Sequence, residues 1–160
     1  AVAIQNGSVQ PQELCIMEDM SKAEYQAFLM KGSRTGKLAT VRPDGRAHLA
    51  PIWFVLETDD NHLYFMTHEE SVKGKNLKQG KSVSLCVDDE EPPFHFVIVE
   101  GDAEILDMSP EEQLKWSTRI AGRYMGAELA DQYGKRNAVP GELVVRIVPT
   151  NIIAKKNIAH

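Results

Sequence analysis

Most of the chain consists of short runs of apolar and alternating residues that end at turn residues, the pattern typical of β-strands. The predicted strands cover residues 37–42, 46–57, 62–67, 81–89, 94–106, 142–148 and 151–156, with Pro149 separating the last two. The first two flank Pro43-Asp44-Gly45, a sequence typical of a tight turn, so they are predicted to pair as a hairpin. Six or seven strands in consecutive hairpins predict an antiparallel barrel.

Helical spacing is found in a few places only. Ser21 is a predicted N-cap for a short helix that ends at Gly32, and a basic helix is predicted to open near Ser71. The strongest helix start is Ser109-Pro110, which opens a long helix toward Gly126, followed by a turn or short helix over residues 127–133. Residues 1–17 show little periodicity and are predicted to be a flexible arm, whereas residues 18–160 are predicted to form one domain.

Two predicted strands, around residues 52–56 and 94–100, are apolar on both faces. A strand of this kind needs a cover on its second face, from a helix, another sheet or a second subunit. The chain offers one long helix for this purpose, so a second subunit is the expected cover and the pattern predicts a homodimer.

The densest group of candidate functional residues lies where the strand ending at Met66-Thr67 meets the basic helix. Thr67, Ser71, Lys73, Lys75 and Asn76 all lie near this junction. The first N–H groups of a helix have no partner inside it, and the helix dipole adds positive charge at the same end. With the hydroxyls and lysines, this arrangement predicts a phosphate site. A solvated surface helix is the alternative.

Composition excludes several classes of function. The net charge of −5 and the absence of a basic stripe argue against nucleic acid, and no apolar run is long enough to cross a bilayer. Cys15 and Cys86 have no metal-type spacing and predict a reduced, cytoplasmic protein. No metal site is predicted, and no motif assigns a catalytic side chain, so a bound cofactor is expected to supply any chemistry.

The ordered segments GKLATVRPDGRAHLAPIWF, LYFMT, SVKGKNLKQGKSVSLCVD and VEGDAEIL resemble the pyridoxamine-phosphate-oxidase-like, FMN-binding split-barrel superfamily. PPFHFVIVEGDAEI, RIAGRYMG and NAVPGELVVRIVPT are most similar to its branch of deazaflavin (coenzyme F-420) dependent oxidoreductases. The resemblance implies a mainly β fold with flanking helices: a six-stranded antiparallel split β-barrel with Greek-key character. It also implies a homodimer with two cofactor sites at the subunit interface.

The resemblance further implies which residues hold the cofactor. Ser71 and Lys73 match the phosphate-binding run of flavin-binding relatives, whereas Val72 stands where those relatives have arginine. Phe96 stands where the oxidase has a ring-contacting glutamine, and the oxidase's C-terminal Arg-x-His element is missing, which argues against a true pyridoxamine phosphate oxidase. The predicted cofactor-binding residues are Ala50, Pro51, Ile52, Trp53, Met66, Thr67, Ser71, Val72, Lys73, Lys75 and Asn76.

The resulting hypothesis is an oxidoreductase that uses coenzyme F-420 or FMN for hydride transfer to a small conjugated acceptor. The substrate is expected to contact residues of the long helix, namely Trp116, Arg119, Arg123 and Tyr124. One alternative keeps the fold and makes the protein an FMN-binding flavoprotein or reductase. Another is a non-catalytic flavin store or haem-binding barrel, with His48 and His95 as the histidines of the barrel strands that could reach a central ligand.

Overall fold

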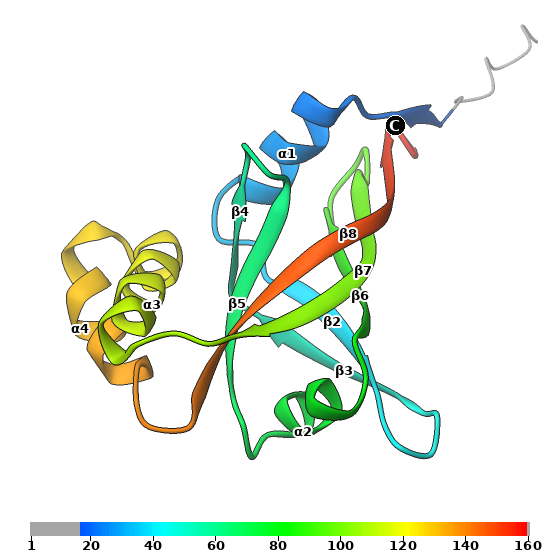
Figure 1. Ribbon diagram of the computed structural model, residues 1–160. Helices are drawn as coiled ribbons and strands as arrows, with labels where there is room; N and C mark the ends of the chain where they lie inside the picture. The colour runs from blue at the N-terminus through cyan, green and yellow to red at the C-terminus, as the bar shows by residue number, and fades with distance from the viewer. Residues whose placement is uncertain (1–16, 160) are drawn as a thin grey trace, which may run out of the picture.

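The computed structural model describes residues 17–159, so most of the predicted N-terminal arm lies outside the described residues. Eight strands and their helices follow in chain order: β1 (Glu18–Asp19), α1 (Lys22–Met30), β2 (Gly36–Val41), β3 (Ala47–Ile52), β4 (Phe54–Glu57), β5 (His62–His68), α2 (Val72–Gln79), β6 (Ser82–Asp88), β7 (Phe96–Leu106), α3 (Pro110–Met125), the 3₁₀ turn η1 (Ala127–Leu129), α4 (Ala130–Asn137) and β8 (Glu142–Lys156). Figure 1 shows the strands curling into a half-barrel, with α3 and α4 on one side and α2 near one end.

The sheet is antiparallel throughout, in the order β3-β2-β6-β7-β8-β5-β4, and the two-residue β1 pairs with the end of β8. β3 and β4 are the two ends of this path, yet only Trp53 separates them in the chain. The sheet must therefore curl until its two edges approach each other at Trp53. This is the geometry of a split barrel, as predicted.

The count of six strands that the resemblance implied is wrong, because the sheet path contains seven strands in addition to β1; the strand pattern had left six or seven open. The predicted strand over residues 46–57 is divided at Trp53 into β3 and β4, which pair with different neighbours. Conversely, β8 continues through Pro149 instead of ending there. Gly101 pairs with Pro149 and Glu100 with Asn151, which leaves Thr150 as the extra residue of a bulge, where a proline is tolerated in a sheet.

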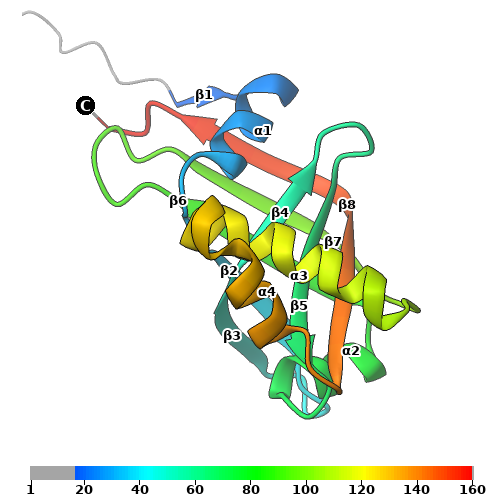
Figure 2. The ribbon, with the colours of Figure 1, turned by 90° about the vertical axis from the view of Figure 1, so that its left-hand side faces the viewer.

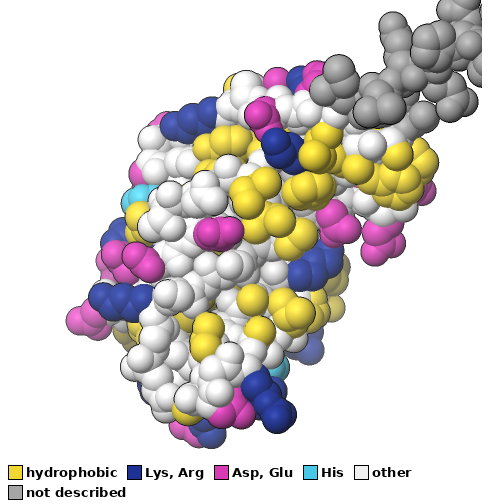
Figure 3. Space-filling model, turned by 90° about the vertical axis from the view of Figure 1, so that its right-hand side faces the viewer, with side chains coloured by type: hydrophobic (Ala, Val, Ile, Leu, Met, Phe, Trp, Pro, Cys, Tyr) yellow, Lys and Arg dark blue, Asp and Glu magenta, His cyan; other side chains and the backbone are white. Residues whose placement is uncertain are grey.

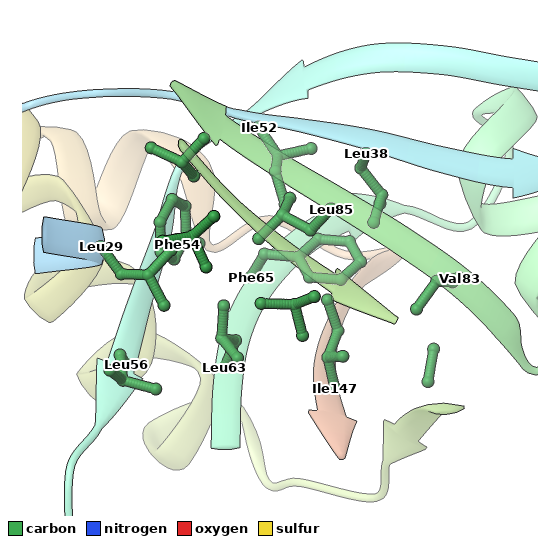
Figure 4. Close-up of a cluster of buried hydrophobic side chains, with 14 of the residues drawn as sticks. Leu29, Leu38, Ile52, Phe54, Leu56, Leu63, Phe65, Val83, Leu85 and Ile147 are labelled. Carbon is green, nitrogen blue, oxygen red and sulfur yellow. The ribbon is translucent and has the colours of Figure 1, made fainter. Parts of the chain in front are cut away.

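The core fills the inside of the curled sheet. Phe54 and Phe65 are fully buried at its centre, and side chains from β2, β6, β7 and β8 pack around them (Figure 4). Leu29 of α1 covers the end of the barrel near β4. Burial of this apolar surface is the main stabilising contribution to a domain of this size.

α3 lies across the outside of β4 and β5, and α4 packs against α3 (Figure 2). The start of α3 follows the sequence pattern: the Ser109 hydroxyl accepts a hydrogen bond from the Glu112 N–H at 3.2 Å, and the Glu112 carboxylate accepts one from the Ser109 N–H at 2.8 Å. Trp116 stacks on Tyr64 of β5 with ring centroids 4.1 Å apart, which attaches the helix to the sheet. No helix in the described part of the chain is long and apolar enough to span a bilayer.

Candidate functional site

A cavity of about 510 Å³ opens between the split edge of the barrel, the start of α2, and the α3–α4 hairpin. Its lining consists of Pro51, Ile52, Trp53, Met66, Thr67, His68, Ser71, Lys73, Ser117, Ile120, Arg136, Asn137, Val139 and Glu142. The volume lies within the range of about 300–1,000 Å³ that is typical of small-molecule sites. Seven of the eleven residues predicted from the sequence line this cavity.

One wall of the cavity is apolar and comes from the ends of β3 and β5. Ile52 is buried, and Trp53 stacks on Tyr124 of α3 with ring centroids 5.0 Å apart and an interplanar angle of 5°. The Tyr124 hydroxyl donates to the Arg34 carbonyl at 2.9 Å and accepts from the Phe54 N–H at 3.1 Å. Trp53 is therefore fixed at the point where the two sheet edges meet.

The opposite side of the cavity is the junction of β5 and α2. Ser71 caps α2: its hydroxyl donates to the His68 carbonyl at 2.7 Å and accepts from the Gly74 N–H at 3.0 Å. Since the Ser71 proton is used in this way, the 2.8 Å contact with Thr67 has the Thr67 hydroxyl as the donor. Both hydroxyls, expected from the sequence to donate to a phosphate, are donating to protein atoms instead.

Other donors at this junction remain open. Within residues 17–159, the first-turn N–H groups of Val72 and Lys73 have no hydrogen-bond partner, and the Lys73 ammonium has no carboxylate within 4.0 Å. Val72 itself is not part of the cavity lining, and its side chain points to solvent at 39% exposure. Gly74 allows this close junction, since a Cβ there would lie 2.3 Å from the His68 carbonyl oxygen.

Four predicted residues do not line the cavity. Asn76 is buried beneath α2 and donates to the Thr40 hydroxyl at 3.0 Å, so it holds the helix on β2. Lys75 points outward and pairs with Glu70 at 3.4 Å. Ala50 lies one residue before the lining part of β3, and the side chain of Val72 is outside the cavity.

The residues of α3 that were expected to contact substrate also lie outside the lining. Arg123 donates to the carbonyls of Leu29 and Phe54 at 2.7 and 2.6 Å, and Arg119 pairs with Glu57. Trp116 and Tyr124 pack on the sheet as described above. These side chains hold α3 in place, and the lining instead receives Ser117 and Ile120 from the same helix.

Sequence reasoning missed the polar residues that the α4–β8 segment brings to the cavity, above all Arg136 and Glu142. Within the described residues, Arg136 forms no ion pair within 4.0 Å; its guanidinium lies 5.3 Å from the centre of the Tyr133 ring. Burial raises the pKa of the Glu142 carboxyl, while the charges of His68 and Lys73 act in the opposite direction. In residues 17–159 no group of three or more His, Cys, Asp or Glu side chains is arranged to hold a metal ion.

A curled antiparallel sheet with a cavity at its split edge is the architecture of the split-barrel class of proteins. The family described as pyridoxamine 5'-phosphate oxidase matches residues 21–156, so the chain belongs to this family. No curated protein matches the chain.

Solved structures agree with this assignment. A conserved hypothetical protein, Rv2991, from Mycobacterium tuberculosis has 30% identity and a TM-score of 0.73, with 86% of each chain covered. A structure named F420 reductase has 25% identity and a TM-score of 0.60, covering 79% of this chain and 94% of its own. HutZ, described as a haem storage protein from Vibrio cholerae, has 16% identity and a TM-score of 0.65, covering 85% and 96%, which shows a shared fold alone.

Proposed function

We propose that the cavity binds a phosphate-bearing deazaflavin, coenzyme F-420, and that the protein is an oxidoreductase. The observation that carries the proposal is the composition of the cavity: it combines an apolar wall from the split barrel edge with Lys73 at the start of α2, whose N–H and ammonium have no partner among residues 17–159. When bound, a reduced deazaflavin supplies a hydride to a small electron-poor acceptor such as a conjugated enone or quinone. The similarity to a structure named F420 reductase supports the choice of cofactor.

Different residues of the cavity bind the phosphate and the ring of the cofactor. The Lys73 ammonium and the Lys73 N–H hold the phosphate. Pro51, Ile52, Trp53 and Met66 form the wall against the ring and exclude water from it. No side chain of the cavity is assigned to proton transfer, so solvent supplies the proton.

FMN is the second candidate cofactor, since Lys73 serves either phosphate. Val72, which replaces the arginine of flavin-binding relatives, removes one cation and favours the deazaflavin. The haem alternative has less support, because His48 and His95 do not line the cavity: His48 contacts Arg42 at 3.3 Å, and His95 accepts from the Asn157 N–H at 3.1 Å.

We also propose that the protein is a homodimer in the cytoplasm. Figure 3 shows hydrophobic side chains gathered on the face that points away from α3 and α4. The β2–β3 hairpin carries two exposed apolar side chains, Leu49 at 69% and Val41 at 52% exposure. A second subunit would cover them. Cys86 is a free thiol, which suits a reducing compartment.

A fluorescence titration of the cofactor-free protein with coenzyme F-420 and with FMN, side by side, tests the proposal. Tighter binding of the deazaflavin, followed by reduction of enones or quinones, is expected. Tighter binding of FMN would move the protein to the flavoprotein alternative. If the protein binds neither cofactor, the proposal of an oxidoreductase is wrong. Light scattering of the same samples gives the oligomeric state.

A further inference from the structure

The cations that line the cavity differ from those on the surrounding surface in having no ion-pair partner among the described residues. On the outer side of the α2 junction the lysines are neutralised, since Lys75 pairs with Glu70 at 3.4 Å and Lys78 pairs with Glu69 at 3.0 Å. Lys73 and Arg136 line the cavity and have no ion pair within 4.0 Å among the described residues, and Glu142 is the carboxylate in the same lining. Without counting His68, the cavity therefore carries two cations and one anion.

The backbone holds Glu142 in this position. Its N–H donates to the Val139 carbonyl at 3.1 Å, and its carbonyl accepts from the Gln113 amide of α3 at 3.1 Å. The preceding Gly141 has φ +91°, and its Cα lies against the His68 ring, so a Cβ there would be 2.5 Å from His68 Nε2. Glu142 is thus the first residue of β8 and is paired with His68 of β5.

His68, the other titratable group beside Glu142, is oriented by the loop that precedes α2. Its Nδ1 accepts from the Glu70 N–H at 3.1 Å, so a neutral ring carries its proton on Nε2. The charged groups that act on Glu142 are accordingly His68 from β5 and Lys73 from α2, and Arg136 from α4 lines the same cavity.

We propose that Glu142 makes the phosphate site selective for a phosphodiester, with one negative charge, over a phosphomonoester, with two. This inference rests on the proposed function, because it assumes that a cofactor phosphate binds at Lys73. Two cations and one carboxylate leave a net charge of +1, which one phosphodiester charge neutralises. A phosphomonoester brings a second negative charge near the Glu142 carboxylate, and the repulsion between them weakens its binding.

The two candidate cofactors differ in this property. Coenzyme F-420 carries its phosphate as a diester, whereas FMN carries a monoester whose second pKa is about 6, so FMN is a dianion at pH 8. Glu142 therefore favours the deazaflavin through the charge of its phosphate, independently of its ring. Burial disfavours the charged form of Glu142, and we infer that this carboxylate is useful because it weakens the binding of a competing cofactor.

The charge of the phosphate can be tested with the ring held constant. FMN and its monomethyl phosphate ester share the ring and the ribityl chain and differ by one negative charge at pH 8. Dissociation constants for both esters and for coenzyme F-420 would be measured at pH 8 and low salt with the wild type, Glu142→Gln and Glu100→Gln. Glu100 is exposed on β7, at the far end of the sheet from Glu142, and serves as the control.

We expect Glu142→Gln to tighten FMN binding about fivefold more than it tightens binding of the methyl ester, the order of magnitude for the repulsion between two unit charges in a solvent-accessible site. Glu100→Gln should leave both constants unchanged. Equal effects of Glu142→Gln on the two esters, or no gain for FMN, would overturn the charge selectivity while leaving cofactor binding intact. Failure of the wild type and of Glu142→Gln to bind any of the three ligands would overturn the proposed function as well.

Discussion

Lys73 offers the sharpest test of the phosphate site, because a second lysine on the same helix turn is its natural control. Lys73 lines the cavity and forms no ion pair within 4.0 Å among the described residues, whereas Lys75 has 61% side-chain exposure and pairs with Glu70. A hydrogen bond to a charged group contributes about 1.5–3 kcal/mol. Lys73→Ala should therefore weaken cofactor binding by about 10- to 150-fold.

The assay is the fluorescence titration of the cofactor-free protein with coenzyme F-420, repeated at two salt concentrations. For Lys75→Ala we expect a dissociation constant within about twofold of the wild type, because exposed ion pairs contribute about 0–1 kcal/mol to stability and this one lies outside the cavity. Both variants keep the same net charge, so any general effect of losing a cation appears equally in each. Equal weakening by the two substitutions, or wild-type binding by Lys73→Ala, would show that the phosphate does not bind at Lys73.

Three further outcomes are expected. Gly74→Ala should destabilise the fold by about 1–3 kcal/mol in urea unfolding, because the new Cβ meets a backbone carbonyl, whereas Gly80→Ala, with open space around it, should cost little. Asn76→Ala should lose about 1–3 kcal/mol of unfolding free energy, since it leaves the buried Thr40 hydroxyl without its donor, and should leave the cofactor affinity of the folded protein unchanged. Burial raises the pKa of Glu142, so the folded state favours the protonated carboxyl and loses that stability as the pH rises through the raised pKa. Glu142→Gln should therefore have a higher Tm than the wild type at pH 8. The difference in Tm should vanish below about pH 4, where the carboxyl is protonated in the folded and the unfolded state. An equal Tm difference at both pH values would contradict this assignment.

Local chemistry in the sequence was sufficient to predict many elements. The Pro43-Asp44-Gly45 turn, with Gly45 at φ +86°, joins β2 and β3 as expected, and Ser21, Ser71 and Ser109 each cap the helix predicted to follow. These features depend on a few adjacent residues, so the pattern alone is informative. The β5–α2 junction was predicted from its own residues and the end of β3 through the family resemblance, and the structure brings seven of the predicted residues into one cavity.

What the sequence did not reveal depends on tertiary packing. Asn76 was predicted to bind phosphate because it lies near lysines, but its side chain points beneath α2 toward Thr40. Arg136 and Glu142 lie more than 60 residues beyond Lys73 in the chain, and only the docking of α4 on α3 and the pairing of β5 with β8 bring them to the same cavity. Amino-acid spacing contains no information on such an approach.

The position of the cavity follows from the way the barrel fails to close. The chain passes from β3 at one end of the sheet path to β4 at the other through Trp53 alone, and Trp53 pairs with neither β2 nor β5. A side chain at this point is excluded from both hydrogen-bonded edges, so it can lie flat on Tyr124 of α3 and form part of the cavity wall. The Tyr124 hydroxyl also accepts a hydrogen bond from the Phe54 N–H and donates one to the Arg34 carbonyl, so α3 covers the gap between the two sheet edges. The same helix contributes Ser117 and Ile120 to the lining, so the element that seals the barrel also shapes the proposed cofactor site.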